Sequence, residues 1–167
     1  MLIDDVSAST GSVRYRLAEP ADGRALARLR WEFHVEDHDD PAVDDLGAFT
    51  DRFLEFWGVA LAERRWTVWV AEIDARIAAN VWIYLIDKVP RPVAGPTALG
   101  YVTNVYAVPG RRDQGVGAGL LTRVITWATE QELELLMVWP SERSVPFYER
   151  AGFRPRDEIL ELHLRGS

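Results

Sequence analysis

Residues 101–121 constrain the fold of this chain more than any other segment, because a strand pattern there runs directly into a helix pattern. The first part is rich in β-branched and aromatic residues up to Val108, and Pro109 then lacks the amide hydrogen that a sheet needs. After the turn, apolar residues recur at helical spacing at Leu120, Leu121, Val124, Ile125 and Ala128. The segment therefore predicts a strand, a short turn and a helix in direct succession.

Three glycines stand where this helix should begin, at positions 115, 117 and 119. Glycine destabilises a helical turn, so its repeated use predicts that another group approaches the main chain closely. Free amides at a helix start, reinforced by the helix dipole, bind anions, and we predict a phosphate-binding loop. The predicted contacts are the Arg112 side chain and the main chain of Asp113, Gln114, Gly115, Val116, Gly117 and Ala118.

Two motifs in this half of the chain resemble signatures of the GNAT superfamily of N-acetyltransferases. Residues 109–117, PGRRDQGVG, resemble the family's acetyl-CoA loop, and residues 147–153, FYERAGF, resemble its later F-Y-x-x-x-G-F signature in the same order. On these residues the chain is identified as a member of the superfamily. The resemblance implies an enzyme that moves an acetyl group directly from acetyl-CoA to an amine of a small acceptor molecule.

The pattern along the whole chain indicates an α/β fold, in the order β-α-α-β-β-β-α-β-α-β. Strands are predicted over residues 13–17, 66–73, 77–86, 99–108, 133–139 and 159–164, and helices over 20–35, 43–63, 115–131 and 144–151. The resemblance implies a central mixed sheet of about six to seven strands flanked by about four helices. It also implies that the fourth and fifth strands splay apart and admit the coenzyme's pantetheine arm.

The composition fits a single domain over residues 1–167, since no linker or repeat divides a chain with 48% hydrophobic residues. Residues 1–11 are polar and are predicted to form a flexible tail. No apolar run is long enough for a membrane span, and we expect a cytoplasmic protein with no membrane partner. Cysteine is absent, which excludes a disulfide framework and an acyl-cysteine intermediate.

A net charge of −7 disfavours broad attraction to nucleic acid or to an anionic membrane. The three histidines, His34, His38 and His163, have no recognisable zinc spacing, and we expect no metal. Dimers are common among the proteins that the chain resembles, so the resemblance leaves a homodimer open.

Acetyl transfer from a thioester to an amine needs a neutral amine, a stabilised oxyanion and a protonated leaving thiolate. The resemblance places the oxyanion donor on the main chain of Tyr106, Ala107 or Val108, and it places the general acid at Tyr148. The alternative role for Tyr148 is simply to cover its helix. Asp113 departs from the glycine usual in the family, and its carboxylate is unfavourable beside a pyrophosphate unless it turns outward or caps the helix.

The general base is not evident, because Thr103 and Asn104 stand where many relatives carry a carboxylate. The other candidates for the base are Glu32, His34 and His38, and ordered water is as plausible as any of them. Glu32, His34 and Asn104 are predicted contacts of the acceptor. An acidic stretch at residues 36–40 and several tryptophans predict a cationic amine acceptor, the alternative being a solvated loop over an aromatic core. The absent carboxylate also leaves open a weakly catalytic acyl-CoA-binding sensor or interaction module.

Overall fold

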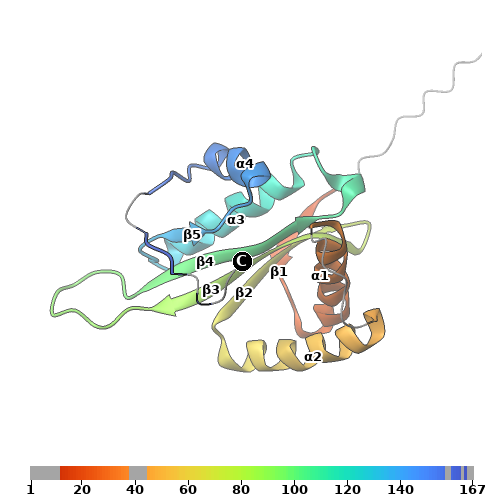
Figure 1. The fold of residues 1–167 in the computed structure, drawn as a ribbon, viewed down its shortest axis with the longest axis horizontal. Helices are drawn as coiled ribbons and strands as arrows, with labels where there is room; N and C mark the ends of the chain where they lie inside the picture. The colour runs from red at the N-terminus through yellow and green to blue at the C-terminus, as the bar shows by residue number, and fades with distance from the viewer. Residues whose placement is uncertain (1–11, 38–44, 157–158, 163, 165–167) are drawn as a thin grey trace, which may run out of the picture.

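The computed structural model describes residues 12–37, 45–156, 159–162 and 164 (Figure 1). Its centre is a five-stranded sheet in the order β1-β2-β3-β4-β5, antiparallel throughout except that β5 runs parallel to β4. The strands are β1 Arg14–Leu17, β2 Trp66–Ile73, β3 Arg76–Asp87, β4 Ala98–Ala107 and β5 Leu136–Val138. The helices are α1 Gly23–Asp37, α2 Leu46–Glu63, α3 Val116–Glu130 and α4 Val145–Arg150, with 3-10 turns η1 Pro20–Asp22, η2 Pro109–Arg111 and η3 Glu142–Ser144.

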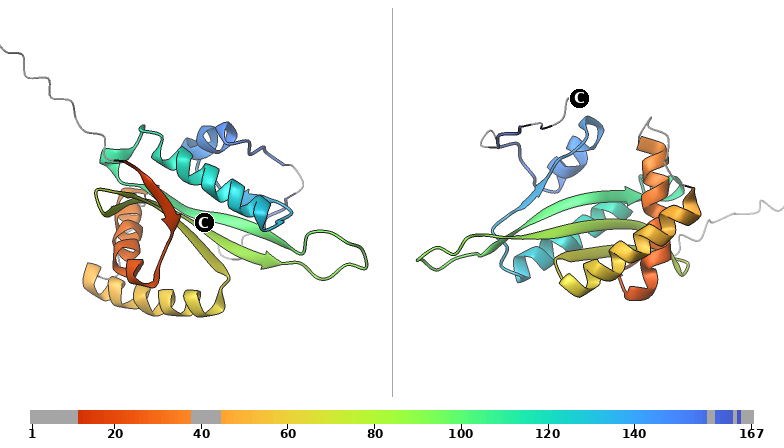
Figure 2. Two further views of the ribbon diagram at one scale, coloured as in Figure 1. Left: turned by 180° about the vertical axis from the view of Figure 1, so that it is seen from behind. Right: turned by 60° about the horizontal axis from the view of Figure 1, so that its bottom comes forward.

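The helices cover the sheet in two layers (Figures 1 and 2). On one face α1 and α2 bury a cluster that includes Leu26, Leu29 and Trp82. On the other face α3 packs Leu120 and Leu121 against the sheet, and α4 lies over the same side. The predicted mixed sheet with helices on both faces is confirmed.

Most of the sequence-derived elements are present with small shifts at their ends, but the last strand is absent. Residues 159–162 and 164 form no strand, and Leu160, Leu162 and Leu164 are 95%, 83% and 88% exposed. The prediction of six to seven strands was therefore wrong: the described residues form five. The leucines alternate as in a half-buried strand, but they are exposed and belong to no strand of the sheet. The predicted tail at residues 1–11 and the start of the second predicted helix, at 43 and 44, lie outside the described residues.

A β-bulge interrupts β4 at Asn104. Its φ is 47°, and the register against β3 shifts between Asn80 and Trp82. The Asn80 side chain is fully buried, and its Nδ2 donates a hydrogen bond of 2.5 Å to the Asn104 carbonyl oxygen. A bulge adds one residue to the strand and so reverses the alternation of side chains beyond it. Consequently Val102 faces the α3 layer, whereas Tyr106, four residues later, faces the α1 and α2 layer.

Strands β4 and β5 separate soon after they meet. Their parallel pairing covers only Gly100, Tyr101 and Val102 on β4, and β4 then continues to Ala107 without this partner. The splay implied by the resemblance is thus present. The second half of β4 presents a main-chain edge that is open on the β5 side.

None of the helices in the described ranges is long and apolar enough to cross a membrane.

Candidate active site

The loop between β4 and α3 leads into a helix start whose first main-chain amides have no helical partner. Gly115 is the N-cap of α3, in the left-handed region at φ 77°, and the first amide bonded back within the turn is that of Gly119, which donates to the Gly115 carbonyl. The amides of Val116, Gly117 and Ala118 lie in the first helical turn, where no preceding helical carbonyl exists to accept them. This is the geometry of an anion-binding helix start.

The side chains of this loop leave these amides accessible. Gln114 Nε2 donates to the Gly110 carbonyl at 2.9 Å, and Arg112 Nε donates to the Ala107 carbonyl at 2.9 Å. Both side chains act as donors to carbonyls, so neither occupies an amide of the loop. The Arg112 guanidinium also lies over the Tyr106 ring, 5.3 Å from its centroid, near the open edge of β4.

Glu36, near the end of α1, holds this arrangement together. The sequence placed it in the acidic stretch facing the acceptor and gave no sign of its pairing with Tyr106 and Arg112. It accepts a hydrogen bond from the Tyr106 hydroxyl at 2.5 Å and one from Arg112 Nη2 at 2.5 Å. Burial acts to raise the pKa of Glu36, but the bonds from Tyr106 and Arg112 outweigh it and hold that pKa below its usual value. Glu36 is therefore a poor base and a firm anchor. A carboxylate 70 residues from its partner in sequence gives no local signal of this kind.

The main-chain amides of β4 differ in the direction they face. Val108 N–H donates to the Ala78 carbonyl of β3 at 2.9 Å, so this predicted oxyanion donor is already used. Amides alternate in direction along a strand, so Tyr106, two residues earlier, also directs its N–H toward β3. Ala107 faces the opposite way, since its carbonyl accepts from Arg112 on the open side. Of the three predicted residues, Ala107 is thus the one whose N–H lies on the open edge.

Tyr148 lies on α4 and is 6% exposed. Its ring packs against Phe147 and Phe153, with centroids 5.1 Å and 5.5 Å away. Burial raises the pKa of Tyr148 to about 12, with a smaller contribution from Tyr101 of β4. The hydroxyl therefore remains protonated over the whole physiological range and can donate a proton or a hydrogen bond.

The two sequence motifs meet at Gly117. A Cβ at this position would stand 3.4 Å from the Phe147 ring, which is ordinary contact. The helix start and the α4 aromatics are therefore adjacent in space.

Gly119 has a different neighbour from the one predicted. A side chain there would overlap the phenol ring of Tyr15, on β1. The close approach that this glycine permits is made by a protein side chain, so assigning it to a phosphate was wrong.

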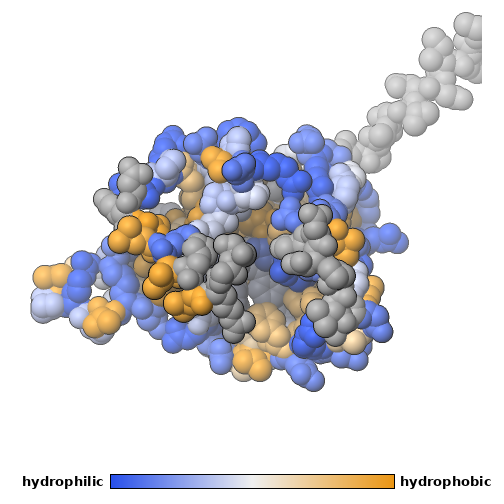
Figure 3. All heavy atoms as spheres, viewed as in Figure 1, coloured by the Kyte–Doolittle hydropathy of each residue, from blue (hydrophilic) through white to orange (hydrophobic). Residues whose placement is uncertain are grey.

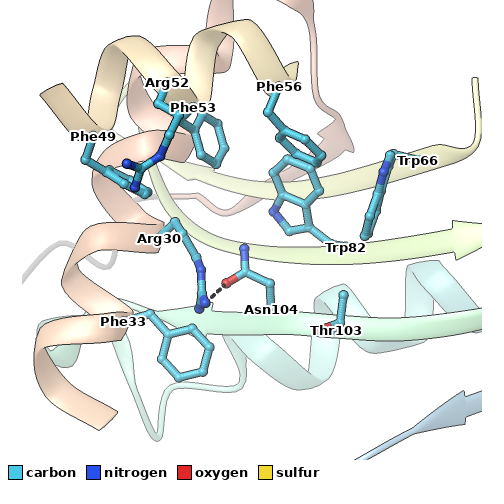
Figure 4. Close-up of a pocket in the computed structure, with 10 residues that line it drawn as sticks. All are labelled: Arg30, Phe33, Phe49, Arg52, Phe53, Phe56, Trp66, Trp82, Thr103 and Asn104. Atoms are coloured by element: carbon cyan, nitrogen blue, oxygen red, sulfur yellow. Dashed lines mark hydrogen bonds between the residues drawn. The ribbon is translucent and has the colours of Figure 1, made fainter. Parts of the chain in front are cut away.

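A pocket of about 380 Å³ lies on the face of the sheet that α1 and α2 cover, between these helices and β4 (Figure 4). Its described lining consists mostly of aromatic rings together with two arginines: Arg30, Phe33, Phe49, Arg52, Phe53, Phe56, Trp66, Trp82, Thr103 and Asn104. Thr103 and Asn104 are consecutive, yet both line the pocket, which a regular strand cannot achieve and the bulge allows. The pocket and the open edge of β4 therefore share the same stretch of strand.

Only one of the three predicted acceptor contacts belongs to this pocket. Asn104 lines it, whereas Glu32 accepts a hydrogen bond from Arg28 at 2.8 Å, and neither Glu32 nor His34 is among the described lining residues. The described part of the acidic stretch is also engaged elsewhere, since Glu36 pairs with Arg112 and Asp37 with Arg143. Its remaining residues, 38–40, lie outside the described residues.

The long loop between β3 and β4 is not part of the described lining of this pocket either. It projects away from the body of the molecule (Figure 1), and Figure 3 shows apolar side chains at its tip. Val89 and Val93 in this loop are 87% and 66% exposed.

Comparison with known proteins decides the family. The model of the acetyltransferase (GNAT) family matches residues 23–153, which include the loop, the bulged strand and α4. The chain belongs to the GNAT family of acetyltransferases. This confirms the resemblance drawn from the two motifs.

Individual GNAT proteins align over different lengths. A glucosamine 6-phosphate N-acetyltransferase of Trypanosoma brucei brucei is 29% identical over 75 residues, 45% of this chain and 51% of that protein. The match thus spans about half the length of that curated relative. A predicted acetyltransferase from Clostridium acetobutylicum, crystallised with acetyl-CoA, superposes with a TM-score of 0.76 at 28% identity, covering 92% of this chain and 97% of the other. Glucosamine-6-phosphate N-acetyltransferase from Arabidopsis thaliana shares the fold, with a TM-score of 0.68 at 17% identity, covering 92% and 99%.

Asp113 is where the GNAT loop of this chain carries strain. Its φ is 59°, a left-handed conformation that glycine adopts freely, and the N-cap of α3 is Gly115, so the predicted capping role of Asp113 is wrong. We expect Asp113→Gly to stabilise the fold by about 0.5–1 kcal/mol. We also expect it to tighten acetyl-CoA binding about fivefold, because a carboxylate is removed from beside the anion site. Thermal unfolding and calorimetric titration measure the two effects.

Glu132→Gly is the matched control for this variant. Glu132 is also left-handed, with φ 53°, but it follows the far end of α3. It should gain similar stability with unchanged acetyl-CoA affinity. Equal changes in affinity for both variants would contradict the assignment of the loop.

Proposed function

We propose that this protein transfers an acetyl group from acetyl-CoA to the amine of a small acceptor. The single observation that carries the proposal is the continuity of three features along one strand: the open edge at Ala107, the amide-rich start of α3 and the pocket behind Thr103 and Asn104. An acyl donor held by the first two would meet an acceptor held by the third. The neighbour from Clostridium acetobutylicum, which contains acetyl-CoA, supports this choice of donor.

The residues present fit the coenzyme. The amides of Val116, Gly117 and Ala118 would hold its pyrophosphate, while Arg112, paired with Glu36, would hold the loop beside it. The open edge of β4 offers main-chain partners for the amide groups of the pantetheine arm. When bound, acetyl-CoA supplies an acyl group activated as a thioester. The Ala107 amide would then stabilise the developing oxyanion, and the Tyr148 hydroxyl would protonate the leaving sulfur.

The acceptor amine must lose a proton without a strong base beside it. The described lining of the pocket contains neither carboxylate nor imidazole, and Thr103 and Asn104 are not bases at neutral pH. We propose that the amine reacts from its neutral fraction, with water taking the proton. The reaction rate should then follow the amine's own pKa.

Two measurements test the proposal. Isothermal titration of the full chain with acetyl-CoA should show saturable binding at one site per chain. A panel of amines incubated with protein and acetyl-CoA should release free thiol, with matching acetylated product by mass spectrometry. A folded protein that fails to bind acetyl-CoA would sink the proposal.

A second candidate is an acyl-CoA-binding module with little catalysis, and the bulge favours it in one respect. It presents Thr103 and Asn104 where a carboxylate would supply general base catalysis. Tight acetyl-CoA binding without turnover across a wide amine panel up to pH 10 would select this candidate. Turnover that rises with pH selects the enzyme.

A further inference from the structure

The pocket behind β4 has a charge opposite to that of the protein around it. The chain carries a net charge of −7, yet the described residues that line the pocket include the partly buried Arg30 and no aspartate or glutamate. Locally concentrated positive charge repels a cation and attracts an anion. The net negative charge of the whole chain would favour a cationic ligand, so the preference for an anion comes from the residues of the pocket alone.

Arg30, on α1, is the more deeply placed of the two arginines and is partly buried. Its Nη1 lies 3.5 Å from Asn104 Oδ1, and its guanidinium carbon lies 5.3 Å from the centroid of the Phe33 ring. Both neighbours are neutral. Burial lowers the pKa of the Arg30 guanidinium, as expected for a cation withdrawn from water without a compensating carboxylate. Within the described part of the chain, this charge has no counter-ion.

Trp82 provides a second unmatched donor on the same side. Its indole is 3% exposed, and its Nε1 has no hydrogen-bond partner among the described residues. Figure 4 shows this nitrogen on the ring edge that faces Arg30 and Asn104. Buried N–H groups nearly always have an acceptor, so Trp82 is an unsatisfied donor on the side of the pocket that holds Arg30.

The remaining walls suit an apolar ligand body. The Trp82 ring lies 5.6 Å from the Trp66 centroid and 5.9 Å from that of Phe53, and Phe56 closes the same side. A volume of about 380 Å³ lies within the range of small-molecule sites, and aromatic walls favour flat or apolar groups.

We propose that the acceptor is an amine with an anionic group, carboxylate or phosphate-like, on an apolar and preferably aromatic body, and that Arg30 binds this anion. The inference rests on the proposed acetyl transfer and names its acceptor class. The anion takes no part in the transfer itself. The amine nitrogen forms a bond to the acetyl carbon, the carbon–sulfur bond breaks, and one proton leaves the amine while one reaches the sulfur.

Matched amines isolate the contribution of the anion. Phenylalanine, its aminophosphonate analogue and phenethylamine share one body and differ in carrying a carboxylate, a phosphonate or neither. Compared at equal concentrations of neutral amine, the better anionic member should exceed phenethylamine in kcat/KM by roughly 10- to 100-fold. The ranking of the two anions identifies the source of the negative charge. A preference for phenethylamine over both would overturn the proposal.

Variants test whether Arg30 carries the preference. Arg30→Met keeps the aliphatic stem and removes the charge, and it should lower the anionic-to-neutral ratio by roughly tenfold or more. Arg24→Met is the control, because Arg24 is exposed on the same helix and is not among the described residues that line the pocket. An unchanged ratio in Arg30→Met, or an equal fall in Arg24→Met, would overturn the assignment.

A binding measurement separates this inference from the proposed function. 3-Phenylpropionate and 3-phenylpropanamide have no amine to acetylate, and both can be titrated into the protein with CoA by following tryptophan fluorescence. Tighter binding of the acid, lost in Arg30→Met, supports the anion site even without turnover. Equal binding of the acid and the amide overturns it. So does the absence of binding of both at concentrations up to 10-fold above the one at which CoA saturates the protein. Coenzyme titration of the same sample reports on the proposed function alone.

Discussion

Replacing Tyr148 by phenylalanine should lower kcat about 100-fold while leaving the dissociation constant of acetyl-CoA nearly unchanged. The ring would still pack against Phe147 and Phe153, so the fold should be retained. What is lost is the only atom of this side chain that can protonate the departing sulfur. Steady-state kinetics and calorimetric titration of the same preparation measure both quantities.

The pH dependence sharpens this prediction. A phenol with a pKa of about 12 keeps its proton throughout the accessible alkaline range. Activity of the unaltered protein should therefore rise with pH as the acceptor amine becomes neutral and then level off. It should not decrease at any pH up to about 10. A fall with a lower midpoint would contradict Tyr148 as the acid. A kcat of Tyr148→Phe less than about threefold below that of the unaltered protein would also contradict this role.

Tyr101→Phe is the control, because Tyr101 is the neighbouring phenol that contributes to the raised pKa of Tyr148. Removing its hydroxyl should change kcat by less than about threefold, since no proton transfer is assigned to it. If both variants lose activity equally, the effect belongs to packing in this region and not to proton donation.

The second large effect is expected on stability, at Gly119. Alanine normally stabilises a helix relative to glycine by about 1 kcal/mol. Here the added methyl group would overlap the Tyr15 ring, so we expect Gly119→Ala to destabilise the fold by about 2 kcal/mol and to lower the melting temperature by about 4–8 °C. Thermal unfolding of the purified protein provides the measurement.

Gly58→Ala is a matched control on α2. Nothing lies within 4 Å of a Cβ at that position, so the ordinary propensity effect should appear there and stabilise the protein. Combining Gly119→Ala with Tyr15→Leu should recover part of the loss, because the smaller side chain makes room for the methyl group. Additive effects of these two substitutions would show that the overlap is not the cause.

The sequence predicted the parts of the site that depend on neighbours in the chain. Residues 109–117 contain the proline, arginine and glycines of one loop, and residues 147–153 contain the aromatic pair of one short helix. Their chemistry follows from local backbone geometry, so a linear pattern is enough to identify them. The order and type of nearly all the elements follow from periodicity for the same reason.

The acceptor side could not be predicted in this way. The pocket combines Arg30 of α1, Arg52 of α2 and Trp82 of β3, which meet only after the sheet and helices pack. Acidic residues near the end of α1 suggested a cationic acceptor, but Glu36 is neutralised by Arg112 across 76 residues. A stretch of sequence shows which charged residues are present. Their ion-pair partners in the folded protein decide which of these charges a ligand encounters.

The last predicted strand and the direction of the β4 amides show two further limits. Leu160, Leu162 and Leu164 alternate as in a strand, but all three side chains are exposed and none lies in the sheet. The extra residue at Asn104 reverses the alternation of side chains along β4, which was predicted correctly up to that point. Asparagine adopts the left-handed conformation more readily than most residues, but the sequence does not show at which asparagine it occurs.

The bulge divides β4 into two parts with opposite side-chain alternation. Before Asn104 the odd-numbered Thr103 faces the layer of α1 and α2, whereas beyond it the even-numbered Tyr106 does. Deleting a single residue here would restore one alternation along the whole strand and turn the Tyr106 phenol away from Glu36. Lengthening or shortening this strand is therefore expected to be a more drastic change than substituting any one of its side chains.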